Sequence, residues 1–161
     1  MPIVELDRLS DDSAIWVFGI APPLDERGAA VLLKTVDAFL GQWTAHNVPV
    51  VCGRELREGR FLVVAAEATS ETSGCSIDKL FGLVRGLEKQ LGISMLDPNA
   101  IFFRDQSGRI ASGSRSEFRD GCNADTIVFD VTAQRLHDLR SGVWERPARD
   151  SWHRQLLAIT A

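Results

Sequence analysis

The chain has 161 residues, of which 45% are hydrophobic and 25% are charged, as is usual for a globular domain. Its 18 basic and 22 acidic residues give a net charge of −4. This balance lacks the strongly basic surface that contacts to phosphate backbones need, so we expect no nucleic-acid partner. The length predicts a single globular domain over residues 1–161.

The N-terminal sequence is acidic where a secretory signal would be basic, and no apolar run is long enough to span a bilayer. Three cysteines lie far apart without C-x-x-C spacing, namely Cys52, Cys75 and Cys122. Scattered cysteines in this number are typical of free thiols. We therefore predict a cytoplasmic protein with no membrane partner and no disulfide framework.

In the N-terminal part, apolar patterning predicts a strand, a helix and a hairpin. The strand is Ala14–Ile20, an apolar run rich in β-formers. The helix is Leu24–His46, with Asp25 as its N-cap. Two further strands, Val48–Arg54 and Arg60–Glu67, flank a glycine-containing turn.

A second amphipathic helix follows a polar linker and stops at Gly92. We place its N-cap at Cys75. Asp78 is then the third helical residue, and the pair forms a capping box with sulfur in place of oxygen. Sulfur is a weak acceptor, so Ser73 and Thr72 are alternative caps.

The C-terminal part predicts a second hairpin over residues 100–114 and a strand at Thr126–Val131. A short helix is expected over Thr132–Gly142, and the closing segment Trp144–Leu157 is expected to pack on the body of the protein.

The element order predicts the α+β class, specifically a ferredoxin-like βαββαβ sandwich with a C-terminal strand and helix extension. Such a fold has helices on one face of an antiparallel sheet. A different α+β sandwich with the same element order is the alternative.

Two blocks carry a resemblance to a known family. They are "FLGQWTAHN", which starts at Phe39, and the S-G-C-x-I-D motif of Ser73–Asp78. In these blocks the chain resembles small bacterial proteins that often carry the label "ABC transporter ATPase". The resemblance implies a bacterial single-domain protein and no particular activity. The ATPase label conflicts with the residues, because the chain contains no Gly-Lys pair and therefore no phosphate-binding P-loop.

A cysteine at a helix start can be a nucleophile, because the helix amides and dipole stabilise a thiolate. Cys75 is therefore a candidate catalytic residue, with His46, or else His153, as its base. Asp78 opposes a thiolate through its own negative charge. The alternative is that Cys75 is a small residue packed in the core.

The same loop predicts a small polar notch for a ligand, formed by Ser73, Gly74, Ser76 and Asp78. Arg60 is a further candidate for binding an anion, together with its neighbours Arg54 and Arg57 at the predicted hairpin. Glu55 and Glu58 lie between these arginines and favour a solvated turn instead.

We predict a module that binds a small polar ligand or a protein, centred on Ser73–Asp78. The alternative is a thiol-dependent enzyme or redox sensor that uses Cys75. The three histidines have no metal-ligand spacing, so no metal and no cofactor is expected.

Overall fold

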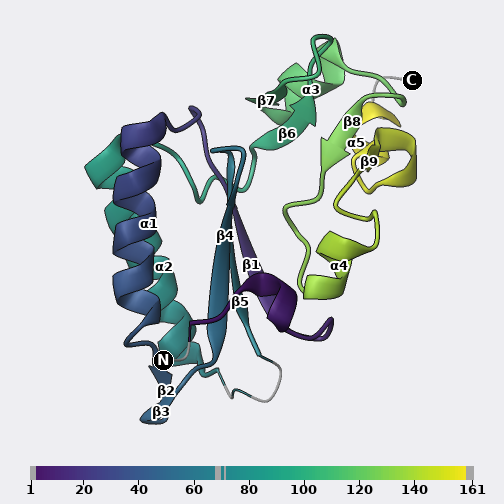
Figure 1. Cartoon of the computed structure of the whole chain (residues 1–161). Helices are drawn as coiled ribbons and strands as arrows, with labels where there is room; N and C mark the ends of the chain where they lie inside the picture. The colour runs from purple at the N-terminus through teal and green to yellow at the C-terminus, as the bar shows by residue number, and fades with distance from the viewer. Residues whose placement is uncertain (1–2, 68–69, 71, 159–161) are drawn as a thin grey trace. The chain divides into compact units, whose positions relative to one another are not determined.

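The computed structural model describes residues 3–67, 70 and 72–158 (Figure 1). The chain contacts divide it into two compact units. Unit 1 extends to Leu96 and includes Gln134–His137, and unit 2 contains Asp97–Ala133 and the residues from Asp138 onward. The single-domain expectation stays a prediction.

The centre of unit 1 is a three-stranded antiparallel sheet with the strand order β1-β5-β4. Its strands are β1 (Ala14–Gly19), β4 (Cys52–Arg57) and β5 (Phe61–Ala66). Every residue of the central strand β5 is buried. The predicted strand at Ala14–Ile20 and the hairpin turn at Gly59 are confirmed, because both have local signals. The strand predicted over Val48–Arg54 is misplaced, because Val48–Pro49 belong to a separate small hairpin and β4 begins at Cys52.

Two helices cover one face of this sheet, as Figure 1 shows. They are α1 (Glu26–Leu40) and α2 (Gly74–Leu91). Each places apolar residues at three- and four-residue intervals on the side that faces the strands. The fully buried helix positions of this core are Leu32, Val36 and Leu40 in α1, and Leu80, Val84 and Leu87 in α2.

The first helix is shorter than predicted. Asp25 is its N-cap, as expected, and accepts a hydrogen bond from the Gly28 amide at 2.7 Å. The helix ends at Leu40, and a small hairpin of β2 (Thr44–Ala45) and β3 (Val48–Pro49) follows. The prediction that the helix reaches His46 is therefore wrong.

The α+β class is confirmed, whereas the ferredoxin-like sandwich is not. Strands β1, β4 and β5 have the order expected for the first three strands of that fold. The next strand, β6 (Ile101–Arg104), pairs instead in the second sheet. The edge of β1 bonds to another segment, since the Ile15 amide donates to the Gln134 carbonyl at 3.1 Å.

Unit 2 contains a four-stranded sheet with the order β7-β6-β8-β9. Its other strands are β7 (Ile110–Gly113), β8 (Ile127–Phe129) and β9 (Glu145–Pro147). The predicted hairpin is confirmed, with Ile101 opposite Gly113. The predicted strand within Thr126–Val131 is also present, as β8.

One helix of unit 2 was not predicted, namely α3 (Arg115–Gly121). Ser114 and Glu117 form a capping box at its start, and the S-x-x-E pattern is the sequence signal that identifies such a start. The predicted helix over Thr132–Gly142 is reduced to α4 (Leu136–Arg140).

The C-terminal segment packs as predicted. It forms the 3-10 helix η2 (Ala148–Asp150) and the short helix α5 (Arg154–Ala158). Leu156 is buried in a cluster with Phe118, and Trp152 packs against the same cluster.

Candidate functional site

The sequence predicts the site at the start of α2. There, two serine side chains satisfy backbone amides of the first helical turn. Ser73 is the N-cap: its Oγ accepts a hydrogen bond from the Ser76 amide at 3.1 Å. In return the Ser76 Oγ accepts from the Ser73 amide at 2.8 Å. The prediction of a Cys75 cap is wrong, because a hydroxyl oxygen accepts an amide hydrogen better than sulfur does.

This cap changes the roles of three predicted residues. Gly74 is the first residue of α2, and an added Cβ there would meet no atom within 4 Å. Cys75 is the second helical residue and is exposed, so its predicted alternative as a core residue is wrong. Asp78 is the fifth helical residue and is exposed, beyond the position of a capping-box acid.

His46 lies in the turn between β2 and β3, with a left-handed φ of 53°, and is exposed. The Trp43 indole N–H donates to the Ser76 carbonyl at 2.9 Å, which places this hairpin beside the start of α2. Among the described residues no hydrogen bond joins His46 to Cys75. His46 and Cys75 therefore share one end of unit 1 without forming a nucleophile–base pair.

Arg60 does not belong to this group. It is buried, and its Nε donates to the Ile20 carbonyl at 3.0 Å. The neighbouring Ala21 bonds to Ser94, just beyond the C-terminus of α2, so Arg60 lies near that end of the helix. A helix of 18 residues is about 27 Å long, which separates Arg60 from Ser73.

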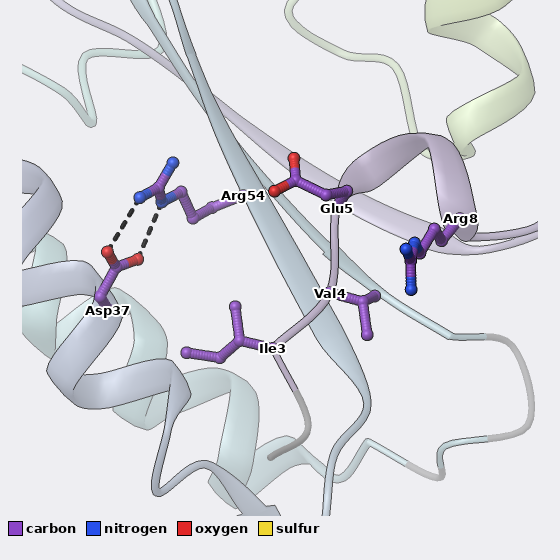
Figure 2. A pocket seen from close by; sticks show the side chains of 6 residues that line it. All are labelled: Ile3, Val4, Glu5, Arg8, Asp37 and Arg54. Atoms are coloured by element: carbon purple, nitrogen blue, oxygen red, sulfur yellow. Dashed lines mark hydrogen bonds and ion pairs between the residues drawn. The ribbon is translucent and has the colours of Figure 1, made fainter.

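A cavity of about 360 Å³ lies elsewhere in unit 1, between the N-terminal segment, β4 and α1. Figure 2 shows the residues that line it: Ile3, Val4, Glu5, Arg8, Asp37 and Arg54. Arg54 extends from β4 toward Asp37 on α1, and Arg8 belongs to the 3-10 helix η1 (Leu6–Arg8). Pockets for small ligands are commonly about 300–1,000 Å³ in volume, so the cavity has a suitable size.

The wall formed by the N-terminal segment is held by backbone contacts. The Val4 amide donates to the Cys52 carbonyl at 2.8 Å, and Ile3 forms a parallel bridge with Cys52. The segment approaches so closely that a Cβ on Gly53 would lie 2.4 Å from the Val4 carbonyl oxygen. Only glycine fits at this position without moving the wall.

Two of the four charged groups in the lining satisfy each other. Arg54 donates to both carboxylate oxygens of Asp37 at 2.8 Å, in bidentate geometry. This bond lowers the pKa of Asp37 and raises that of Arg54, and the Glu5 charge also raises the pKa of Arg54. The pair therefore stays ionised.

Glu5 and Arg8 are the remaining charges of the cavity. Both are exposed. Among the described residues, neither side chain has a hydrogen-bond partner. One carboxylate and one guanidinium thus remain available to a ligand.

The sequence analysis did not identify this cavity. Arg54 was noted only as a neighbour of Arg60, and its partner Asp37 is 17 residues away along the chain. No local motif connects the two residues, because a helix and a strand bring them together.

Within the described part of the chain, no group of three or more His, Cys, Asp or Glu side chains could hold a metal ion. No helix of that part is long and apolar enough to cross a membrane. No family model, curated protein or solved structure matches the chain. The resemblance to small bacterial proteins therefore stays a prediction.

Proposed function

We propose that this protein binds a small dipolar molecule, with one positive and one negative group, in the cavity lined by Arg54 and Asp37. The observation that carries the proposal is the charge arrangement of the lining. Arg54 and Asp37 neutralise each other, whereas the Glu5 and Arg8 side chains form no hydrogen bond or ion pair within the described residues. An ammonium group of a ligand would pair with Glu5, and a carboxylate with Arg8.

The helix-start loop at Ser73–Asp78 is not proposed as the centre of this site. The Ser73 and Ser76 side chains and amides bond to each other, so they offer a ligand little. The proposed ligand still belongs to the class of small polar molecules that the sequence predicts.

A titration with 4-aminobutyrate, followed through backbone amide NMR shifts, tests the proposal. Butylamine and butyrate serve as analogues that each keep one charge. We expect 4-aminobutyrate to shift the amides of Val4, Glu5 and Arg54, and to bind more tightly than either analogue.

Glu5→Gln and Arg8→Gln should each weaken this binding about threefold to tenfold, as expected for the loss of one charge-assisted hydrogen bond. Asp7→Asn is the matched control, because Asp7 is exposed on η1 and does not line the cavity. The proposal fails if these amides do not shift, or if Asp7→Asn weakens binding as much as Glu5→Gln.

The second candidate function is thiol chemistry at Cys75, supported by the exposure of that residue in the first turn of α2. An exposed thiol is accessible to an electrophile or an oxidant. The rate of Cys75 alkylation measured against pH tests this candidate. An apparent thiol pKa below that of a free cysteine would favour it, and an ordinary value would reject it.

We also propose that the protein is bacterial and cytoplasmic. The bacterial origin rests on the family resemblance alone. The cytoplasmic location is supported by the three free cysteines, which are typical of a reducing compartment.

A further inference from the structure

Unit 2 contains a second cavity, of about 560 Å³, formed by its C-terminal segment. Three arginines line it, namely Arg146, Arg149 and Arg154. Asp150 is the one acidic residue in the described lining. We call this cavity the arginine notch.

Arg146 lines the notch with a half-buried side chain. Its Nε is buried and has no hydrogen-bond partner among the described residues, and no ion pair to its guanidinium is found in that part of the chain. Burying part of a charged group without a partner costs free energy, so a counter-charge near the Arg146 guanidinium is favoured. An anionic ligand in the notch would supply that counter-charge.

The other two arginines differ in their pairing. Arg149 forms an ion pair with Asp125 and lies 4.0 Å from Asp150, which holds its side chain in place. Arg154 is exposed and makes no ion pair within the described residues. The described lining thus holds three guanidinium groups and one carboxylate, and Asp125, outside the lining, pairs with Arg149.

Two rings pack together beside the notch, since Trp152 of its lining is followed in the chain by the buried His153. His153 is 1% exposed and stacks on the Trp152 ring, with 4.0 Å between the ring centroids. The Ser151 Oγ lies 2.7 Å from His153 Nδ1. The pKa of His153 is lowered to about 4, mainly by burial; the Asp130 charge opposes this shift and the Arg146 charge adds to it. The imidazole is therefore neutral near pH 7, and the arginines supply the positive charge of the notch.

We propose that the arginine notch binds a small anion that carries a phosphate or carboxylate group, with Arg146 and Arg154 as its charged contacts. Guanidinium groups match the oxygens of both anions through paired N–H donors. Arg149, already paired with Asp125, forms the side of the notch. This site belongs to unit 2 and does not depend on the proposed function of the cavity in unit 1.

Calorimetric titration of the full chain with inorganic phosphate, and separately with malonate, tests the proposal at ionic strength held constant with sodium chloride. Binding of either anion above the chloride control supports it, and the comparison of the two identifies the preferred group. Arg146→Gln and Arg154→Gln should each weaken binding, by about tenfold for Arg146, since each removes a charge-assisted contact.

Arg115→Gln is the matched control, because Arg115 is an exposed arginine of unit 2 at the start of α3, outside the notch. Its affinity should stay within about twofold of the wild type, since exposed charges away from a site contribute little. Circular dichroism checks that each variant is folded, and the exposed Arg154 decides the question if Arg146→Gln unfolds. The proposal is overturned if neither anion binds, or if Arg115→Gln weakens binding as much as Arg154→Gln does.

Discussion

Ser73 and Ser76 each accept a hydrogen bond from the backbone amide of the other, at 3.1 and 2.8 Å. This reciprocal pair fixes the first turn of α2 and leaves Cys75 on the exposed side of the helix. Two serines three residues apart thus perform the role that a serine and a glutamate perform in the usual capping box.

Replacement of Ser73 by alanine should lower the free energy of unfolding by about 1 kcal/mol, because the Ser76 amide loses its acceptor. Asp78→Ala serves as the matched control in the same helix and should change it by less than about 0.5 kcal/mol, since Asp78 is exposed outside the cap. Urea denaturation measures both values. A larger loss for Asp78→Ala than for Ser73→Ala would contradict the observed cap.

The cysteines should differ sharply in reactivity. Cys75 is exposed, whereas Cys52 is fully buried and burial raises its thiol pKa to about 11. Iodoacetamide should therefore modify Cys75 in the folded protein and reach Cys52 only after unfolding. Mass spectrometry of peptides after a short exposure identifies the modified residue. In the Cys75→Ser variant, rapid labelling of Cys52 would show that the core is more open than described.

The stability of the protein should fall as the pH is lowered from about 6.5 toward 4 because of His153. The buried imidazole has its pKa lowered to about 4 in the folded state, against 6.5 for the ordinary group. Between these values the unfolded chain binds a proton that the folded chain does not, so the free energy of unfolding increases with pH. The slope from one such group is at most about 1.4 kcal/mol per pH unit.

Denaturation midpoints between pH 5 and 6.5, where most carboxylates remain ionised, measure the contribution of His153. His153→Asn removes the titrating group and should flatten this part of the profile, whatever its effect on overall stability. His137→Asn is the control, because His137 is exposed. An unchanged slope in His153→Asn would show that the imidazole is not kept neutral by burial.

Gly53→Ala should displace the N-terminal segment that walls the unit 1 cavity. A Cβ at this position would lie 2.4 Å from the Val4 carbonyl oxygen. This oxygen is a backbone atom, so no side-chain rotation can relieve the clash. We expect a loss of about 1–3 kcal/mol in the free energy of unfolding, together with faster hydrogen exchange at the Val4 amide.

Gly82→Ala is the control for this substitution. Gly82 lies within α2, and an added Cβ there meets nothing within 4 Å. Alanine should therefore stabilise the helix by about 0.5–1 kcal/mol. A Gly53→Ala variant as stable as the wild type, with an unchanged Val4 amide, would be inconsistent with the close approach.

Leu156→Ala should destabilise unit 2 by about 2–3 kcal/mol, because Leu156 is buried in the cluster with Phe118 and Val128. Gln155→Ala changes the exposed neighbour in α5 and should have an effect below about 0.5 kcal/mol. Thermal denaturation of the two variants makes the comparison. Equal melting temperatures would show that the C-terminal segment does not stabilise the fold.

The sequence by itself determined the elements whose signals are local. The Asp25 cap, the turn at Gly59 and the stop at Gly92 each depend on residues within a few positions of one another. Such signals act through hydrogen bonds and backbone preferences of neighbouring residues. The α3 start at Ser114 had the same kind of signal and was available from the sequence.

The N-cap of α2 could not be assigned from the neighbouring residues alone. Thr72, Ser73 and Cys75 are all possible caps by residue type, and the choice depends on the backbone conformation of each. The extended backbone of Ser73, with φ of −109° and ψ of 164°, selects it. The residue types alone do not specify that backbone conformation.

Only the tertiary structure decided which charged residues form ion pairs. Arg54 and Asp37 are 17 residues apart, and Arg149 and Asp125 are 24 apart. Packing between separate elements brings each pair together, and many pairings of the chain's 18 basic and 22 acidic residues are compatible with the same secondary structure. The pairing of β6 in the second sheet has a similar cause. Which strands pair depends on how much apolar surface the whole fold buries, and the local sequence of one strand does not determine this.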